Sequence, residues 1–312
     1  MAFLTIFSTP KPFTNPHIAT IQRNAIQSWR SLGSDVEVML VGRESGTAKV
    51  VKELGLRYLP DVTRNEAGTP LISSIFTLAR ENSRAPLLAY VNADIVLTPE
   101  FVTAAHQVAD GFEHFLMIGQ RYDLRVIESL DFSPGWADRL YLRVKEQGRR
   151  HPPRGSDYFV YPRSCFVDLP GFAVGRAGWD NWMIYKAWLE RWPIIDATPS
   201  VWIVHQDHDY SHLPSGQFYY DLPETDENIR LAGGRMNTRF TLIDANWRFE
   251  DGQIRPAGFK LVRFLRKVEL LISARNEPPV KLCTVLYTLI YTWRIRLQSS
   301  RRTKYTLPKR SV

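Results

Sequence analysis

The first hundred residues alternate short apolar runs with segments of helical periodicity. Strands are predicted over residues 3–7, 36–42 and 56–62, and helices over 17–29, 47–55 and 68–82. Residues 87–97 are expected to form a fourth strand and its exit. Pro70 is expected in the first turn of the third helix, and Gly55 just past the end of the second. Strand–helix repeats of this kind form βαβ units whose parallel strands join one sheet. We therefore expect an α/β fold with a mostly parallel central sheet flanked by helices.

The rest of the chain divides by pattern and by charge. A strand is expected over 115–126, a strand with a loop over 156–166, and one or two strands that run into a histidine-rich loop over 193–212. A loop followed by a helix is expected over 131–148, and a helix opened by a turn over 178–192. Residues 258–312 hold 13 of the 40 Lys and Arg residues and only two acidic residues. This shift predicts a main domain over 1–257, with halves 1–110 and 111–257, and a basic helical C-terminal extension over 258–312.

Several protein classes are disfavoured by what the sequence contains. No Gly-x-Gly-x-x-Gly follows the first strand and no Walker lysine motif is present, which argues against dinucleotide dehydrogenases and P-loop enzymes. Cys165 and Cys283 are far apart, which argues against a disulfide framework and fits a reducing compartment. The apolar N-terminus predicts a strand rather than a signal peptide, and no run reaches the roughly 18 apolar residues of a membrane span. A cytoplasmic protein is expected. Its near-neutral main domain argues against nucleic-acid binding.

Two polar residues stand at the end of a buried strand. The run "LLAYVNADIVL" (87–97) places Asn92 and Asp94 where the chain leaves the fourth predicted strand. A lone buried carboxylate is costly, so it is normally paired or bound to a metal. In open parallel sheets, ligands bind at the carboxyl ends of the strands. Asp94 is therefore either a turn or cap residue before the helix near Pro99, or a ligand for Mg²⁺ or Mn²⁺.

A histidine-rich segment ends the last predicted strand of this domain. In "HQDHDYSH" (205–212), His205, His208 and His212 have no accompanying cysteine and lack the helical spacing of metalloproteases. They either pack near Asp207 and Asp209 or supply a ligand to the metal held by Asp94. His205 is the preferred candidate for this metal ligand, because it directly ends the predicted strand, and His208 is the second candidate.

Asp180 opens an expected amphipathic helix after a Gly-Trp turn. It is either the N-cap of that helix or a carboxylate that takes a proton from an attacking hydroxyl. The neighbouring Trp179 and Trp182 form either an apolar platform for a sugar face or part of the core.

Loops at the ends of other strands carry groups that suit phosphate. In "RNEAGTP" (64–70), Arg64 and the backbone N–H groups of Gly68 and Thr69 precede a predicted helix, whose N-terminus favours anions. Arg43 ends another strand. Each of these residues, taken alone, is explained equally well as an ordinary charged or polar group of the protein surface.

The segments "TPKPF" (9–13), "RNEAGTPL", "YVNADI", "WDNW" and "HQDHDYSH" together resemble the GT-A glycosyltransferases. They are similar to those of bacterial and plant glycosyltransferase-like proteins. The resemblance implies a Rossmann-like GT-A fold with a nucleotide-binding half over 1–110 and an acceptor half over 111–257. It also implies Mn²⁺ or Mg²⁺ on an Asp-x-Asp type motif, in which Asn92 replaces the leading aspartate.

The implied reaction moves a sugar from a nucleoside diphosphate sugar to a hydroxyl of a carbohydrate or lipid-linked acceptor. The resemblance implies that Asp94, with His205 or His208, binds the metal. It implies that Asp180 is the general base if the configuration of the sugar inverts, or orients the acceptor if the configuration is retained. It also implies a set of nucleotide or diphosphate contacts. The nucleotide and diphosphate contacts are Thr9, Arg43, Arg64, Thr69 and Asn92. The alternatives are a nucleotidyltransferase and a metal-dependent hydrolase that uses His205, His208 and His212.

The basic extension supports a separate hypothesis. Its apolar residues recur at helical spacing with Arg263, Arg266 and Lys267 between them. Such a helix either lies on an anionic membrane surface as a peripheral anchor, or packs on the main domain with a solvated basic face.

Overall fold

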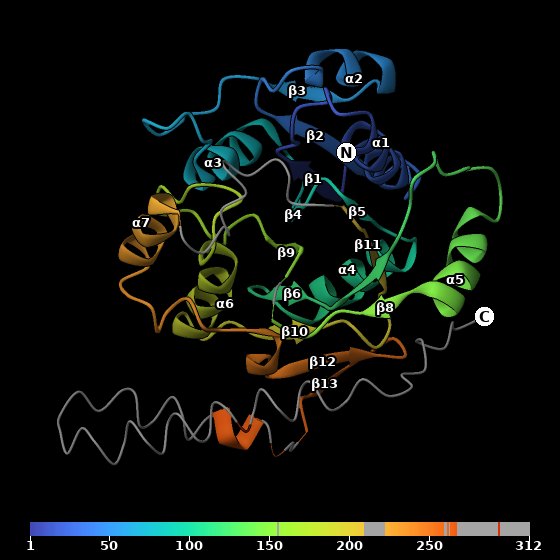
Figure 1. Ribbon diagram of the computed structural model, residues 1–312. Coiled ribbons are helices and arrows are strands. Elements are labelled where there is room, and N and C mark those ends of the chain that lie inside the picture. The colour runs from blue at the N-terminus through green and yellow to red at the C-terminus, as the bar shows by residue number, and fades with distance from the viewer. Residues whose placement is uncertain (155, 209–221, 259–260, 262, 267–292, 294–312) are drawn as a thin grey trace.

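The computed structural model describes residues 1–154, 156–208, 222–258, 261, 263–266 and 293. Its larger sheet has nine strands (Figure 1), which are β1 (Leu4–Ser8), β2 (Val36–Val41), β3 (Arg57–Leu59), β4 (Leu87–Val91), β6 (Leu116–Ile118), β9 (Tyr158–Pro162), β10 (Ile194–Asp196), β12 (Trp247–Glu250) and β13 (Gln253–Pro256). A smaller sheet contains β5 (Ile95–Val96), β7 (Arg121–Leu124), β8 (Arg149–Arg150) and β11 (Ile203–Gln206). The helices are α1 (Pro16–Arg30), α2 (Thr47–Leu54), α3 (Ile72–Asn82), α4 (Glu100–Gly111), α5 (Trp136–Gln147), α6 (Trp179–Leu189) and α7 (Pro223–Leu231), with a 3₁₀ turn at Leu242–Asp244.

The nine strands lie in the order β13-β12-β10-β6-β9-β4-β1-β2-β3. Strand β9 is antiparallel to both β4 and β6, and β13 is antiparallel to β12, whereas the remaining neighbours pair in parallel. The predicted fold class, a mostly parallel central sheet flanked by helices, is confirmed.

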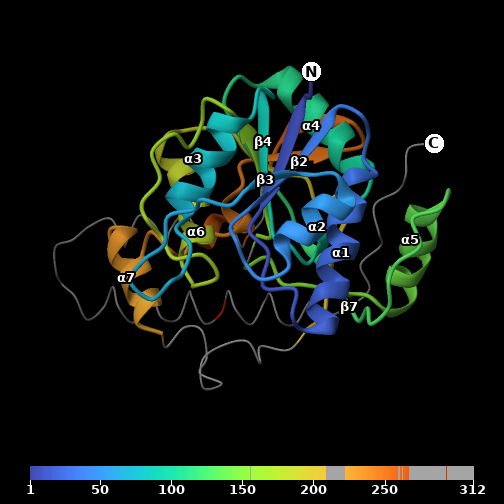
Figure 2. The same cartoon turned by 90° about the horizontal axis from the view of Figure 1, so that it is seen from above.

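Alternating side chains of the strands fill two separate cores. In β4, Leu87, Ala89 and Val91 pack with apolar residues of α1, α2 and α4, whereas Leu88 and Tyr90 pack with those of α3 and α6. The two sets of helices cover opposite faces of the sheet (Figure 2). Every residue of β4 is buried. A continuous apolar run is what a central strand covered on both faces requires.

The smaller sheet brings distant segments to the end of β4. The chain leaves β4, turns over three residues and enters β5, which pairs antiparallel with β11. Strand β11 pairs in parallel with β7, and α5 packs on this sheet. The Nε1–H group of Trp29 in α1 donates to the carbonyl of Ile95 at 2.9 Å, which ties the sheet to the main body.

Some local predictions were wrong. The run 115–126, predicted as one strand, divides into β6 and β7, which belong to different sheets. The fourth strand is confirmed as β4, and its predicted exit contains the short strand β5 of the smaller sheet. Pro70 lies before α3 rather than in its first turn, because residues 64 and 70 form an isolated β-bridge and α3 begins only at Ile72. Gly55 is confirmed at the end of α2, with φ of 62°.

The C-terminal extension is described only at a few positions. Among these, Arg266 is 1% exposed, and its Nε donates to Asp244 Oδ1 at 2.8 Å. Its guanidinium also lies over the Phe240 ring, 5.1 Å from the centroid. Arg266 therefore packs on the main domain, as the second alternative expects of this helix, but its charge is buried rather than on a solvated face. Lys267 lies outside the described part of the chain. No helix within that part is long and apolar enough to cross a membrane.

Candidate functional site

The backbone of Asp94 is fixed where the two sheets meet. The Ile95 N–H donates to the carbonyl of Asn92 at 3.1 Å, which closes the turn after β4. The carbonyl of Asp94 accepts from the backbone N–H of Gln206 at 3.3 Å and from its side-chain Nε2 at 3.1 Å. Gln206 is fully buried in β11. Helix α4 takes Pro99 as its N-cap, so Asp94 is not the cap residue of that helix.

The side chains of Asp94, His205 and His208 converge at this point. Asp94 Oδ2 lies 3.0 Å from His208 Nε2 and 3.8 Å from His205 Nε2. All three side chains are largely buried, and their ligand atoms lie within 4.8 Å of one another. The predicted convergence of Asp94 with a late histidine is confirmed for both candidates. His212 lies outside the described residues.

The Asp94 carboxyl is held in its charged form. Burial opposes ionisation, but the hydrogen bond to His208 and the nearby charges of His205 and Lys11 bring its pKa well below the ordinary value. Its second oxygen, Oδ1, is buried and has no hydrogen-bond partner within the described residues. An orphaned carboxylate oxygen beside two imidazoles fits a divalent cation.

His205 lies between three carboxylates. Its Nδ1 is 3.3 Å from Asp123 Oδ1 and 3.7 Å from Asp207 Oδ1, while Nε2 faces Asp94. Although burial lowers the pKa of the imidazole, Asp123, Asp207 and Asp94 raise it to about 9. The ring therefore carries a proton at neutral pH when no metal is bound.

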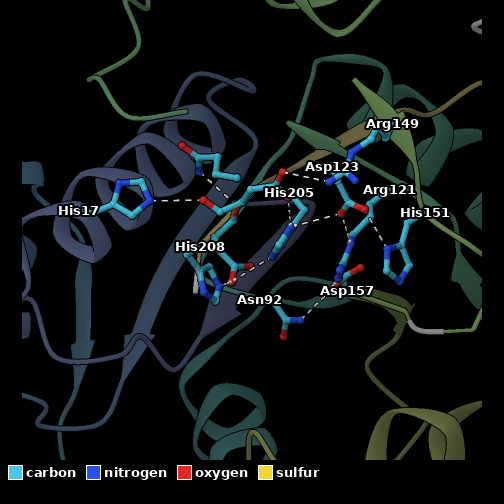
Figure 3. A network of polar contacts seen from close by, with 12 residues as sticks. His17, Asn92, Arg121, Asp123, Arg149, His151, Asp157, His205 and His208 are labelled. Carbon is cyan, nitrogen blue, oxygen red and sulfur yellow. Dashed lines mark hydrogen bonds and ion pairs between the residues drawn. The ribbon is translucent and has the colours of Figure 1, made fainter. Parts of the chain in front are cut away.

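A wider polar network surrounds this cluster (Figure 3). Asp123 accepts from Arg121 Nε and from His151 Nδ1, both at 2.9 Å. Asp157 accepts from a terminal nitrogen of Arg121 at 2.6 Å and from Asn92 Nδ2 at 3.1 Å. The side-chain amide of Asn92 is thus used within the protein, and its predicted contact with a nucleotide stays a prediction.

The four network residues other than Asn92 were not predicted from the sequence. Arg121 and Asp123 lie in β7, His151 follows β8, and Asp157 directly precedes β9. The available signal was the charged pair within "QRYDL", immediately after an apolar strand.

Asp180 lies in the first turn of α6. Gly178 occupies the N-cap with φ of 104°, so the alternative that Asp180 is the cap is wrong. Burial, followed by the charge of Asp157, raises the pKa of Asp180 to about 6, against the lowering effect of nearby backbone N–H groups. Asp180 therefore interacts electrostatically with Asp157, which accepts the hydrogen bond from Asn92.

Helix α6 differs from the expected amphipathic helix. Trp188 and Leu189 are 47% and 51% exposed, so apolar side chains also occupy its outer face. Trp179 and Trp182 are 5% and 7% exposed and pack against Phe159 and Phe172. They belong to the core, which decides against a sugar platform.

The residues expected at the nucleotide lie around the same edge of the sheet. Thr9 follows β1, and its Oγ1 is buried without a hydrogen-bond partner within the described residues. Lys11, two residues further on, is near enough to lower the pKa of Asp94. Arg43 follows β2 and is exposed. The structure leaves the roles of Thr9 and Arg43 as predictions.

Arg64 and Thr69 belong to a second polar cluster. Arg64 forms an ion pair with Glu44 at 2.6 Å and donates to the carbonyl of Gly68 at 2.8 Å. The N–H of Gly68 donates to the Asn65 carbonyl, and that of Thr69 to Asn65 Oδ1. These two N–H groups are therefore engaged within the loop, and α3 begins only at Ile72. A phosphate contact of Arg64 or Thr69 remains a prediction.

Comparisons with known proteins find distant structural similarity only. No protein-family model matches the chain, and no curated protein matches it. One similar structure is glucosyl-3-phosphoglycerate synthase from Mycobacterium tuberculosis with Mn²⁺, uridine diphosphate and glucosyl-3-phosphoglycerate. It is 13% identical, with a TM-score of 0.46, and the match covers 83% of this chain and 88% of that one. Another is S. aureus TarS 1–349 with UDP-GlcNAc, which is 13% identical with a TM-score of 0.43. That match covers 98% of this chain and 93% of the other. Each similarity is weak in sequence and in structure.

Proposed function

We propose that this protein is a metal-assisted glycosyltransferase of the GT-A type, which moves a sugar from a nucleoside diphosphate sugar to a hydroxyl acceptor. The observation that carries the proposal is the convergence of Asp94, His205 and His208 at the ends of β4 and β11. Ligands of open α/β sheets bind at this edge. Asp180, with its raised pKa, is coupled to the same network through Asp157.

Asp180 acts on the acceptor. A carboxyl whose pKa is about 6 is ionised at neutral pH, yet basic enough to take a proton from a hydroxyl as that group attacks. The bond between the anomeric carbon and the diphosphate oxygen breaks, and a bond to the acceptor oxygen forms. The acceptor proton goes to Asp180, and the nucleoside diphosphate leaves with the bonding electron pair.

Asp94, His205 and His208 would hold the metal, and Lys11 adds a positive charge near Asp94. When bound, a divalent metal neutralises charge on the departing diphosphate. The fixed backbone of Asp94 and the burial of both histidines keep these donors in place before the substrate arrives.

The proposal is tested by donor binding and by product analysis on the full-length protein. Thermal unfolding is followed with UDP-, GDP- and dTDP-sugars, each with and without Mn²⁺, because a ligand that binds the native state raises the melting temperature. We expect one nucleotide class to raise it only when Mn²⁺ is present, and the Asp94→Asn protein to lose the effect.

The same experiment separates the two alternatives. A nucleotidyltransferase would be stabilised by a nucleoside triphosphate and would release pyrophosphate. A metal-dependent hydrolase would release product without any acceptor. Stabilisation by none of the nucleotide sugars, or equal stabilisation of the Asp94→Asn protein, would overturn the assignment.

A further inference from the structure

Asp123 is the most heavily contacted carboxylate of the network, and the reaction proposed above gives it no part. We propose that Asp123 is a positioning residue, which orients the His205 imidazole so that its Nε2 points at the metal beside Asp94. The inference rests on the proposed function, because it concerns the same metal group.

The sheet register places the two residues side by side. Strands β7 and β11 pair in parallel with His205 opposite Asp123, so their side chains extend on the same face. The Nδ1 atom of His205 lies 3.3 Å from Asp123 Oδ1. Both side chains are largely buried, at 12% and 14% exposure, so water competes little for this contact.

Asp123 is itself held from two sides. Arg121 Nε donates to Oδ1 and His151 Nδ1 contacts Oδ2, both at 2.9 Å. Arg121 also bridges to Asp157 at 2.6 Å, which restrains the guanidinium. A carboxylate fixed in this way presents a preformed acceptor to the His205 ring.

The chemistry of the pair decides which imidazole nitrogen carries the proton. Nδ1 of His205 is buried, lies 3.3 Å from Asp123 Oδ1, and has no closed hydrogen bond within the described residues. An ionised carboxylate only accepts hydrogen bonds, so Nδ1 is the donor when this contact closes. In the neutral ring, Nε2 then keeps its lone pair, and it faces Asp94 Oδ2 at 3.8 Å. Metal-binding histidines commonly donate their other N–H to a carboxylate, which fixes the tautomer and the ring orientation.

Asp207 provides a matched comparison on the same ring. Its Oδ1 lies 3.7 Å from His205 Nδ1, against 3.3 Å for Asp123. Asp207 is 35% exposed and shares its charge with Arg149 at 3.3 Å. Asp123 is therefore the dominant acceptor, and Asp207 contributes less.

The test measures Mn²⁺ binding by the full-length protein through the electron paramagnetic resonance signal of free Mn²⁺. The variants are Asp123→Asn, Asp123→Ala, Asp207→Asn and Asp94→Asn. We expect Asp123→Ala to weaken binding by about 10- to 100-fold. Asp123→Asn is expected to weaken it less, because its amide oxygen still accepts from Nδ1. Asp207→Asn is expected to stay within about threefold of the parent.

A spectroscopic readout separates orientation from general damage. Pulsed resonance of bound Mn²⁺ is expected to show nitrogen couplings from two imidazoles in the parent and from one fewer in Asp123→Ala. If Asp123→Ala does not fold, the Asp123→Asn and Asp207→Asn proteins still decide the matter. Parent-like affinity of the Asp123 variants, or equal weakening by Asp207→Asn, overturns the inference.

Failure of the inference and failure of the proposed function give different results. A parent protein that binds Mn²⁺, an Asp94→Asn protein that does not, and Asp123 variants that bind like the parent would refute only the role of Asp123. A parent protein that binds no Mn²⁺ would refute the metal group itself, and the role of Asp123 with it.

Discussion

Replacing Asp180 with asparagine is expected to stabilise the protein above pH 6, even though it removes the proposed base. Burial and the charge of Asp157 raise the pKa of Asp180 from 3.8 to about 6 in the folded protein. The folded state therefore binds more protons than the unfolded state between about pH 4 and pH 6. The free energy of unfolding falls as pH rises through this interval, and it stays lowered above pH 6.

The magnitude follows from the size of the shift. Each pH unit corresponds to about 1.36 kcal/mol, so a shift of roughly two units gives about 3 kcal/mol as an upper value. The Asp180 side chain is partly exposed, and solvent screening reduces this figure. We expect Asp180→Asn to be more stable than the parent by about 1–3 kcal/mol at pH 8. At pH 4, where Asp180 is protonated in the folded parent, the two should be nearly equal.

The assay is urea unfolding of both proteins at pH 8 and at pH 4. Asp226→Asn is the matched control, because Asp226 is an exposed acid in the first turn of another helix, α7. An exposed acid there interacts favourably with the helix dipole, so the control is expected to lose about 0.3–1 kcal/mol at pH 8. The reasoning is refuted if Asp180→Asn is less stable than the parent at pH 8, or if its gain is the same at both pH values.

Three further changes test other parts of the structure. For the proposed sugar transfer, kcat/KM is expected to fall below about pH 6, because Asp180 becomes protonated there. Asp157→Asn should move this fall to lower pH, because the charge of Asp157 raises the pKa of Asp180. Profiles of kcat/KM against pH check both expectations. Gly178→Ala is expected to cost about 1–3 kcal/mol in urea unfolding, because φ is 104° and the added Cβ would lie 3.1 Å from Thr238 Cγ2. Glu224→Ala is expected to cost about 0.5–1.5 kcal/mol in the same assay, because two partly buried partners, Asn65 and Arg176, lose their acceptor.

The elements that could be predicted from the sequence are those whose pattern is local. Strand β4 is an unbroken apolar run that is buried throughout, and Gly55 ends α2 in the left-handed conformation that glycine adopts readily. Strands β5 and β8 have two residues each, which is too short for an alternation of apolar and polar side chains to reveal them in the sequence. The start of α3 was misplaced because tertiary pairing, through the bridge between Arg64 and Pro70, holds that segment extended.

The site was predictable to the same extent. That a ligand group would lie at the end of β4 followed from the fold class, because ligands of open α/β sheets bind at the carboxyl ends of the strands. The approach of His205 to Asp94 depends in addition on the antiparallel pairing of β5 with β11 in the smaller sheet. Asp123 could not be assigned, because its role depends on the register of β7 against β11. That pairing joins residues about eighty positions apart, and register is set by packing rather than by a local motif.

The same network explains why an amide occupies position 92. Asn92 Nδ2 donates to Asp157 Oδ1 at 3.1 Å, and that oxygen also accepts from Arg121. An aspartate at this position would bring a second carboxylate against Asp157, and like charges about 3 Å apart do not both ionise readily. The amide removes this repulsion and leaves the charge of Asp157 to act on Asp180. Because Asn92 is committed to Asp157, the group formed by Asp94, His205 and His208 contains a single carboxylate, Asp94.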